Sequence, residues 1–147
     1  MKKIFLIGFL FFLSISTMSL AKQSMISLKD YINKNNVNET AVQSYVFNRC
    51  AAVSLYVSSL FQHYQDKSLS VKAEKNYKFF SEANFIHLTN KGNMTAESAS
   101  KNFDENVPSM TKIYFNDGQN NFLQSGEYTT GYIIEDFQIC DNFLKLK

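Results

Sequence analysis

The chain is poor in the residues that interrupt secondary structure. Its 147 residues include one proline, Pro108, and five glycines. Strands joined by tight turns need many such residues, so their scarcity argues against an all-β fold. Apolar residues instead recur at steps of three and four, which is the spacing of one face of a helix. The sequence therefore predicts an all-α fold, and specifically a four-helix up-and-down bundle.

The chain has no excess of positive charge once residues 1–21 are set aside. The chain has 15 lysine and arginine residues against 13 aspartate and glutamate residues, and Arg49 is its single arginine. Residues 1–21 carry two of the lysines and no acid, which leaves 13 side chains of each sign in residues 22–147. A neutral domain is not typical of proteins that bind nucleic acid or anionic membrane surfaces. We therefore expect no nucleic-acid partner.

Motifs that mark catalytic or metal centres are also missing. The sequence contains no C-x-x-C, C-x-x-C-H, phosphate-binding loop, G-x-S-x-G or H-E-x-x-H. His63 and His87 lack partners at ligand spacing, and the helix rise places them far apart. The adjacent carboxylates Asp104–Glu105 and Glu135–Asp136 point in different directions on a helix, so we expect both pairs to be solvated. The sequence favours no metal, no cofactor and no enzyme activity.

The first 21 residues have the three parts of a bacterial-type secretory signal peptide. Lys2 and Lys3 precede an apolar run from Ile4 to Leu13, and small residues follow up to Ala21. The apolar run is shorter than the roughly 20 residues that a membrane helix needs. We therefore expect cleavage after Ala21 and a periplasmic or secreted protein of residues 22–147. The alternative is an uncleaved N-terminal membrane anchor.

Periodicity and capping signals divide the rest of the chain into helices. Residues 22–39 form an N-terminal segment with a short helix expected at 28–34, where Ser27 begins a capping box. Residues 40–147 form the bundle domain. Its main helices are expected at 40–65, 70–90, 95–118 and 129–144. Pro108 should kink or split the third of them, and residues 119–128 read as a loop.

The two cysteines are 90 positions apart, and each lies on the apolar stripe of its own helix. In an up-and-down bundle the first and last helices are antiparallel neighbours, so Cys50 and Cys140 can meet. This register sets apolar residues opposite one another: Val46 and Leu144, Val53 and Phe137, and Val57 and Ile133. Disulfides persist in exported, oxidising compartments. The sequence therefore predicts a Cys50–Cys140 disulfide that joins the first and last helices.

Charged and aromatic residues beside these stripes are the candidates for binding. Arg49 should lie near Asp141 in the same register, either as an ion pair at the edge of the seam or as an anion-binding or partner-binding residue. Aromatic residues in excess of one stripe are candidate interface anchors, because aromatic side chains often carry binding energy. With Arg49, the candidate partner-binding residues are Tyr45, Tyr56, Phe79 and Phe85.

These observations favour a non-catalytic protein-binding, accessory or inhibitor-type module. Its partner is expected to be an envelope protein, because the chain is expected to be exported. Two alternatives stay open: a carrier of a small apolar ligand with a cavity inside the bundle, and an enzyme without a recognisable motif.

Overall fold

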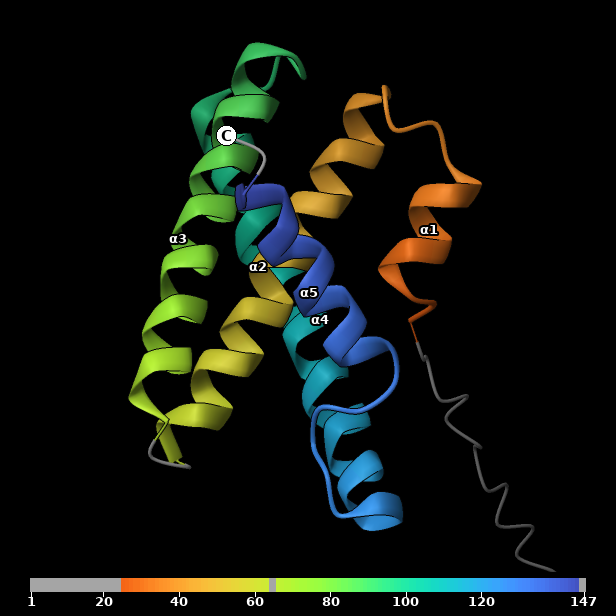
Figure 1. The fold of residues 1–147 in the computed structure, drawn as a ribbon. Coiled ribbons are helices and arrows are strands. Elements are labelled where there is room, and N and C mark those ends of the chain that lie inside the picture. The colour runs from red at the N-terminus through yellow and green to blue at the C-terminus, as the bar shows by residue number, and fades with distance from the viewer. Residues whose placement is uncertain (1–24, 64–65, 146–147) are drawn as a thin grey trace, which may run out of the picture.

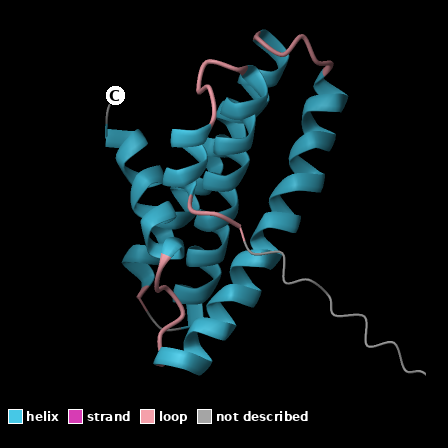
Figure 2. Ribbon diagram, turned by 90° about the vertical axis from the view of Figure 1, so that its right-hand side faces the viewer, coloured by secondary structure: helices cyan, strands magenta, loops and turns pink. Residues whose placement is uncertain are grey.

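The computed structural model describes residues 25–63 and 66–145. Within them the secondary structure consists of helices joined by loops (Figures 1 and 2). The helices are α1 (Leu28–Lys34), α2 (Thr40–His63), α3 (Lys67–Asn90), α4 (Ala96–Ser125) and α5 (Tyr132–Lys145). The predicted all-α class is confirmed. The described part of the chain has five helices rather than four, because the short N-terminal helix also packs against the bundle. The expected signal peptide, residues 1–21, and its cleavage site lie outside the described residues.

The four long helices alternate in direction, as the chain passes down α2, up α3, down α4 and up α5 (Figure 1). The second helix is the central element, since it contacts each of the other four. The first helix lies to one side and packs against α5 and α2. None of the helices within the described residues is both long enough and apolar enough to cross a membrane.

Local side-chain caps explain where three helices begin. Ser27, Asp66 and Thr95 precede α1, α3 and α4, and each side chain accepts a backbone N–H of the first turn at 3.1 Å. Such caps satisfy donors that have no partner within the helix. The predicted bounds of α1 are confirmed, whereas α3 begins at Lys67, earlier than expected, because Asp66 provides its cap.

The fourth helix decides between two expectations and corrects a third. It runs as one helix through Pro108, so the predicted split is wrong and the single-helix alternative holds, and it continues to Ser125 across residues that read as a loop. Packing accounts for the extension, because Asp117 and Gly118 are buried and Asn121 donates to the carbonyl of Thr130 at 3.3 Å. Tertiary contacts of this kind override the weak helix preference of a polar segment.

Gly118 allows α2 and α4 to approach closely. A Cβ atom at this position would overlap the hydroxyl of Tyr56. That hydroxyl passes over the glycine and donates to the carbonyl of Tyr128 at 3.0 Å. The glycine inside α4 is therefore needed for packing and does not mark a helix end.

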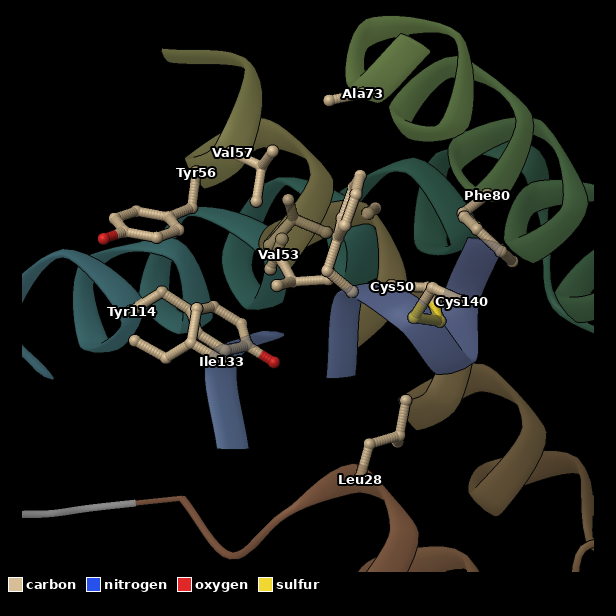
Figure 3. Close-up of a cluster of buried hydrophobic side chains, with 14 of the residues drawn as sticks. Leu28, Cys50, Val53, Tyr56, Val57, Ala73, Phe80, Tyr114, Ile133 and Cys140 are labelled. Atoms are coloured by element: carbon tan, nitrogen blue, oxygen red, sulfur yellow. A yellow bond between two sulfur atoms is a disulfide. The ribbon is translucent and has the colours of Figure 1, made fainter. Parts of the chain in front are cut away.

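The predicted Cys50–Cys140 disulfide is present and lies inside the core (Figure 3). Both cysteines are fully buried, and their Cα atoms are 5.4 Å apart. The residues that the register set opposite one another are buried or packed against the same core: Val46, Val53, Val57, Ile133, Phe137 and Leu144. Periodicity in two distant segments was sufficient to place this seam.

Candidate functional site

A buried ion pair lies beside the disulfide. Arg49 on α2 donates to Asp136 Oδ2 on α5 through Nη2 at 2.6 Å and Nε at 3.0 Å, and both side chains are 0% exposed. The Tyr114 hydroxyl also donates to Asp136 Oδ2 at 2.6 Å. The backbone N–H of Leu28 donates to Asp136 Oδ1 at 2.6 Å. Both oxygens of the carboxylate are therefore satisfied, as a buried charge requires.

Aromatic side chains enclose the guanidinium. Arg49 Nη1 donates to the Tyr45 hydroxyl at 3.1 Å. The guanidinium carbon lies 6.0, 5.9 and 5.7 Å from the ring centroids of Tyr45, Tyr114 and Tyr132. Contacts at this distance add a cation–π attraction, which is larger away from water. We call Arg49, Asp136, Tyr114 and Tyr45 the buried charged cluster.

The cluster corrects the expected surroundings of Arg49. Its partner is Asp136, whereas Asp141 pairs with Lys72 and Lys145, each at 2.8 Å. Sequence reasoning placed Asp136 in solvent with its neighbour, yet it is fully buried. A signal was available, because position 136 lies three residues after one buried residue of α5 and four before another.

Burial shapes the ionisation of the cluster. Burial raises the pKa of Tyr114 well above its usual value, and Asp136 adds to this rise. Burial alone would lower the pKa of Arg49, but Tyr114 and Asp136 outweigh it and the pKa is raised. Burial raises the pKa of Asp136, and the donors around its carboxylate oppose that rise. Arg49, Asp136 and Tyr114 are fully buried and paired with one another, and only Tyr45 in the cluster is half-buried, so the arrangement fits a structural role better than proton transfer with a substrate.

We expect the protein to lose stability at alkaline pH. Burial raises the pKa of Tyr132, and so does its hydrogen bond to Asp117 at 2.7 Å. An unfolded tyrosine ionises near a pKa of about 10. Because the pKa values of Tyr114 and Tyr132 are both raised in the folded state, their contribution is complete below about pH 10 and is lost as the pH rises further. Denaturant unfolding at several alkaline pH values measures this loss.

The Tyr132→Phe variant is the control for that expectation. It keeps the ring but removes the ionisable hydroxyl, so its free energy of unfolding should fall less steeply with pH than that of the wild type. The same slope in both proteins would contradict a contribution from Tyr132.

The five candidate partner-binding residues fall into different places. Arg49 and Tyr56 are 0% and 1% exposed, which corrects their expected position on the surface: both side chains point inward and are hydrogen-bonded. Tyr45 is half-buried and stacks on Tyr31, with ring centroids 4.0 Å apart. Phe85 is exposed. Phe79 is half-buried and lines a hollow between α2 and α3.

That hollow is large and mostly apolar. It has a volume of about 1060 Å³ and is bounded by α1, the loop after it, α2, α3 and the end of α5. Its apolar lining residues are Ile32, Val37, Val42, Val46, Phe47, Phe79, Phe80, Ala83, Ile86 and Phe143. Its polar lining residues are Asn38, Gln43, Glu82, His87, Asn90 and Lys91. We call it the apolar groove.

A second hollow of about 570 Å³ lies between the start of α2, the end of α3 and α4. Asparagine side chains reach it as a hydrogen-bonded chain, in which Asn84 donates to Asn48 at 2.7 Å and Asn48 donates to Asn102 at 2.9 Å. Tyr45 and Lys91 also line it. Its polar lining distinguishes it from the apolar groove.

The structure holds no set of three or more His, Cys, Asp and Glu side chains suited to a metal ion within residues 25–63 and 66–145. His87 packs edge-on against Phe47, and its Nε2 lies 3.1 Å from the carbonyl oxygen of Thr40. His63 is the last residue of α2.

Comparison with known proteins provides no relative from which a role could be transferred. No family model, curated protein or solved structure matches this chain. The function therefore has to be inferred from the chemistry of the groove and the cluster.

Proposed function

We propose that this chain is a non-catalytic binding module of an exported compartment, and that the apolar groove receives an apolar helix of a partner protein. The observation that carries the proposal is the exposure of apolar side chains along the groove. Ile86, Val37 and Phe143 are 56%, 44% and 37% exposed. Contiguous apolar surface of this kind is costly to leave in water and usually marks an interaction site.

The shape of the groove favours a helical segment. Its two long walls are the adjacent helices α2 and α3, and aromatic side chains from both walls form its floor. An amphipathic helix binds such a groove by placing residues i, i+3, i+4 and i+7 against the floor. Phe47 and Phe79, which are half-buried, would then contact the apolar face of the partner.

The polar rim favours a peptide over a lipid. Glu82 and Lys91 bring one charge of each sign, and Asn38, Gln43 and Asn90 bring amides. A polypeptide can complement both charges and the amides, whereas the anionic headgroup of a fatty acid or phospholipid could pair with Lys91 but would leave Glu82 without a complement. This balance of charge is the reason that we prefer a protein partner.

The disulfide and the buried charged cluster fit the same proposal. A disulfide between α2 and α5 suits an oxidising, exported compartment, where an envelope protein is the expected partner. The charges that could do chemistry are enclosed and paired with one another, so we propose no catalytic activity. Their contribution is to hold the helices that form the groove.

A carrier of a small apolar ligand is the second candidate, and the size of the groove is the observation that favours it. A volume of about 1060 Å³ lies at the upper end of the range for small-molecule sites, which is roughly 300–1,000 Å³. Such a carrier would hold its ligand in this surface groove and would not need a cavity enclosed by the bundle.

Two matched substitutions on α3 test the proposal. Ile86 lines the groove and is 56% exposed, whereas Val71 is 49% exposed and lies outside it. We expect Ile86→Asp to weaken binding of the isolated partner by about 100-fold, because a carboxylate would be buried unpaired, and we expect Val71→Asp to leave binding nearly unchanged. The partner is first identified by crosslinking in the native compartment, and its affinity is then measured by calorimetry with purified components.

Phe85 provides a further comparison, because it is exposed on the same helix but does not line the groove. Phe85→Ser should bind as the wild type does. Equal affinities for Ile86→Asp and Val71→Asp would refute the groove as the binding site. A native mass spectrum that shows a bound lipid and no protein partner would instead support the carrier.

A further inference from the structure

We infer that α1 is a positioned wall of the apolar groove, that Arg49 sets its position from inside the bundle, and that occupation of the groove is therefore coupled to the docking of α1. The inference rests on the proposed function, because it identifies α1 as the wall of the groove that determines how tightly an occupant is held. It concerns Tyr31, Tyr45 and Arg49, none of which lines the apolar groove.

The first helix cannot hold its own conformation. It has seven residues, and helices shorter than about 12 residues are marginal in water. The loop that follows it, residues 35–39, is exposed throughout. The position of α1 is therefore set by its contacts with α5 and α2, together with the packing of Met25 on the core before it and the hydrogen bond from Gln43 Nε2 to the Val37 carbonyl at 2.8 Å after it.

The first of these contacts is made by Leu28. Its backbone N–H donates to Asp136 Oδ1 at 2.6 Å, and its side chain is 0% exposed. In Figure 3 this side chain points from α1 toward the Cys50–Cys140 disulfide. The start of α1 is thus held to α5 by one hydrogen bond to a buried carboxylate and by the burial of one leucine.

The second contact is made one turn later by Tyr31. Its ring stacks on Tyr45 of α2, with centroids 4.0 Å apart. The hydroxyl of Tyr45 accepts a hydrogen bond from Arg49 Nη1 at 3.1 Å. Arg49 donates at the same time to Asp136 Oδ2. Both contacts of α1 therefore meet at one guanidinium, which fixes Asp136 on one side and Tyr45 on the other.

The docked helix presents its next residues to the groove. Ile32 follows Tyr31 directly, and Val37 and Asn38 follow in the loop; all three line the groove. If α1 leaves its place, Ile32 leaves with it, whereas Val37 remains tied to α2 through the hydrogen bond from Gln43 Nε2 to its carbonyl at 2.8 Å, and the walls formed by α2 and α3 remain. An occupant that touches Ile32 must therefore bind more tightly when α1 is docked, and it must stabilise the docked state by the same factor.

Tyr31→Ala tests the inference, with Tyr31→Phe as its control. The alanine variant removes the stacking partner of Tyr45 but substitutes no residue that lines the groove, forms the disulfide or makes the ion pair. We expect amide hydrogen exchange in residues 28–38 to become at least about tenfold faster, with exchange in α2 to α5 unchanged. Phenylalanine keeps the stacked ring, so Tyr31→Phe should exchange as the wild type does.

The coupling is measured with the uncharged fluorescent apolar probe Nile red, so that the charge of Glu82 does not oppose its binding. The groove is its site if Ile86→Asp abolishes the fluorescence and Val71→Asp does not. We then expect the probe to slow exchange in residues 28–38 of the wild type, and to bind about tenfold more weakly to Tyr31→Ala but normally to Tyr31→Phe.

The outcomes separate this inference from the proposed function. If exchange in α1 does not respond to Tyr31→Ala, or if α1 is released and the probe binds as before, the inference is overturned while the groove stands. If Ile86→Asp leaves probe binding unchanged, the groove itself is wrong, and the coupling that depends on it falls as well.

Discussion

Asp136→Ala is expected to lower the free energy of unfolding by about 3 to 5 kcal/mol, which is the usual cost of leaving a buried charge without its partner. Arg49 would remain charged and fully buried with only tyrosines near it. The Tyr114 hydroxyl and the Leu28 N–H would lose their acceptor. Urea unfolding followed by far-UV circular dichroism, with the disulfide intact, measures the change.

Two comparisons separate the unpaired charge from loss of packing. Replacing Arg49, Asp136 and Tyr114 together with Met, Leu and Phe removes every charge of the cluster and keeps apolar volume, so the triple variant should be more stable than Asp136→Ala. Glu105→Ala breaks an exposed ion pair with Lys101 and should change stability by no more than about 0.5 kcal/mol. If the triple variant is as unstable as Asp136→Ala, the penalty does not come from the unpaired charge.

Removing the disulfide is expected to have an effect of similar size. The bond closes a loop across 90 positions. The chain-entropy model gives about 4.7 kcal/mol for a loop near 100 residues, and removal of native disulfides commonly costs about 2 to 5 kcal/mol. A protein of this length typically has a free energy of unfolding of about 5 to 15 kcal/mol, so the Cys50→Ala, Cys140→Ala double variant should retain only part of the stability of the wild type.

Thermal and urea unfolding of that double variant measure the loss. The reduced and thiol-blocked wild type provides a second estimate, since it lacks the same bond but keeps different side chains in the core. Both proteins should have a lower free energy of unfolding than the oxidised wild type. A loss under about 1 kcal/mol in the double variant would show that the packed seam between α2 and α5 is sufficient without the bond.

The features that the sequence predicts well are those that depend on local spacing. The capping signal at Ser27 correctly placed α1, and apolar periodicity placed α2 and α3 to within a few residues. The same periodicity put Cys50 and Cys140 on stripes that had to face each other. Such signals are carried by neighbouring residues, so one sequence is enough to read them.

The features that sequence-based reasoning missed depend on contacts between distant segments. Residues 119–125 have no strong helix signal, and they are helical because the end of α4 is held against α2 and the loop before α5. Arg49 and Asp136 lie on apolar stripes, but an average preference for exposed charges hid the pair. Each charge is tolerated in the core only because the other is present.

The apolar groove was beyond sequence reasoning for a different reason. Val37, Ile86 and Phe143 come from three separate segments and look like ordinary core residues in the sequence. Their exposure follows from the absence of a covering element among the described residues, which only the arrangement of the helices can show. Of the predicted partner-binding residues, Phe79 alone lines the groove; the sequence predicted it as an interface anchor, because it lies beside the inner stripe of α3, and predicted no groove.

The hydrogen bond from Leu28 to Asp136 joins positions 108 apart, and this sets an order of events in synthesis. A chain is made from its N-terminus, so α1 and α2 are complete long before α5 exists. Until α5 has been made, Arg49 lacks Asp136 as its counterion, Cys50 has no thiol to pair with, and the N–H of Leu28 lacks its carboxylate acceptor. A chain that stops before Tyr132 therefore lacks all three closures at once. Folding can therefore be completed only after α5 has been made, and chains truncated before it should remain susceptible to proteolysis.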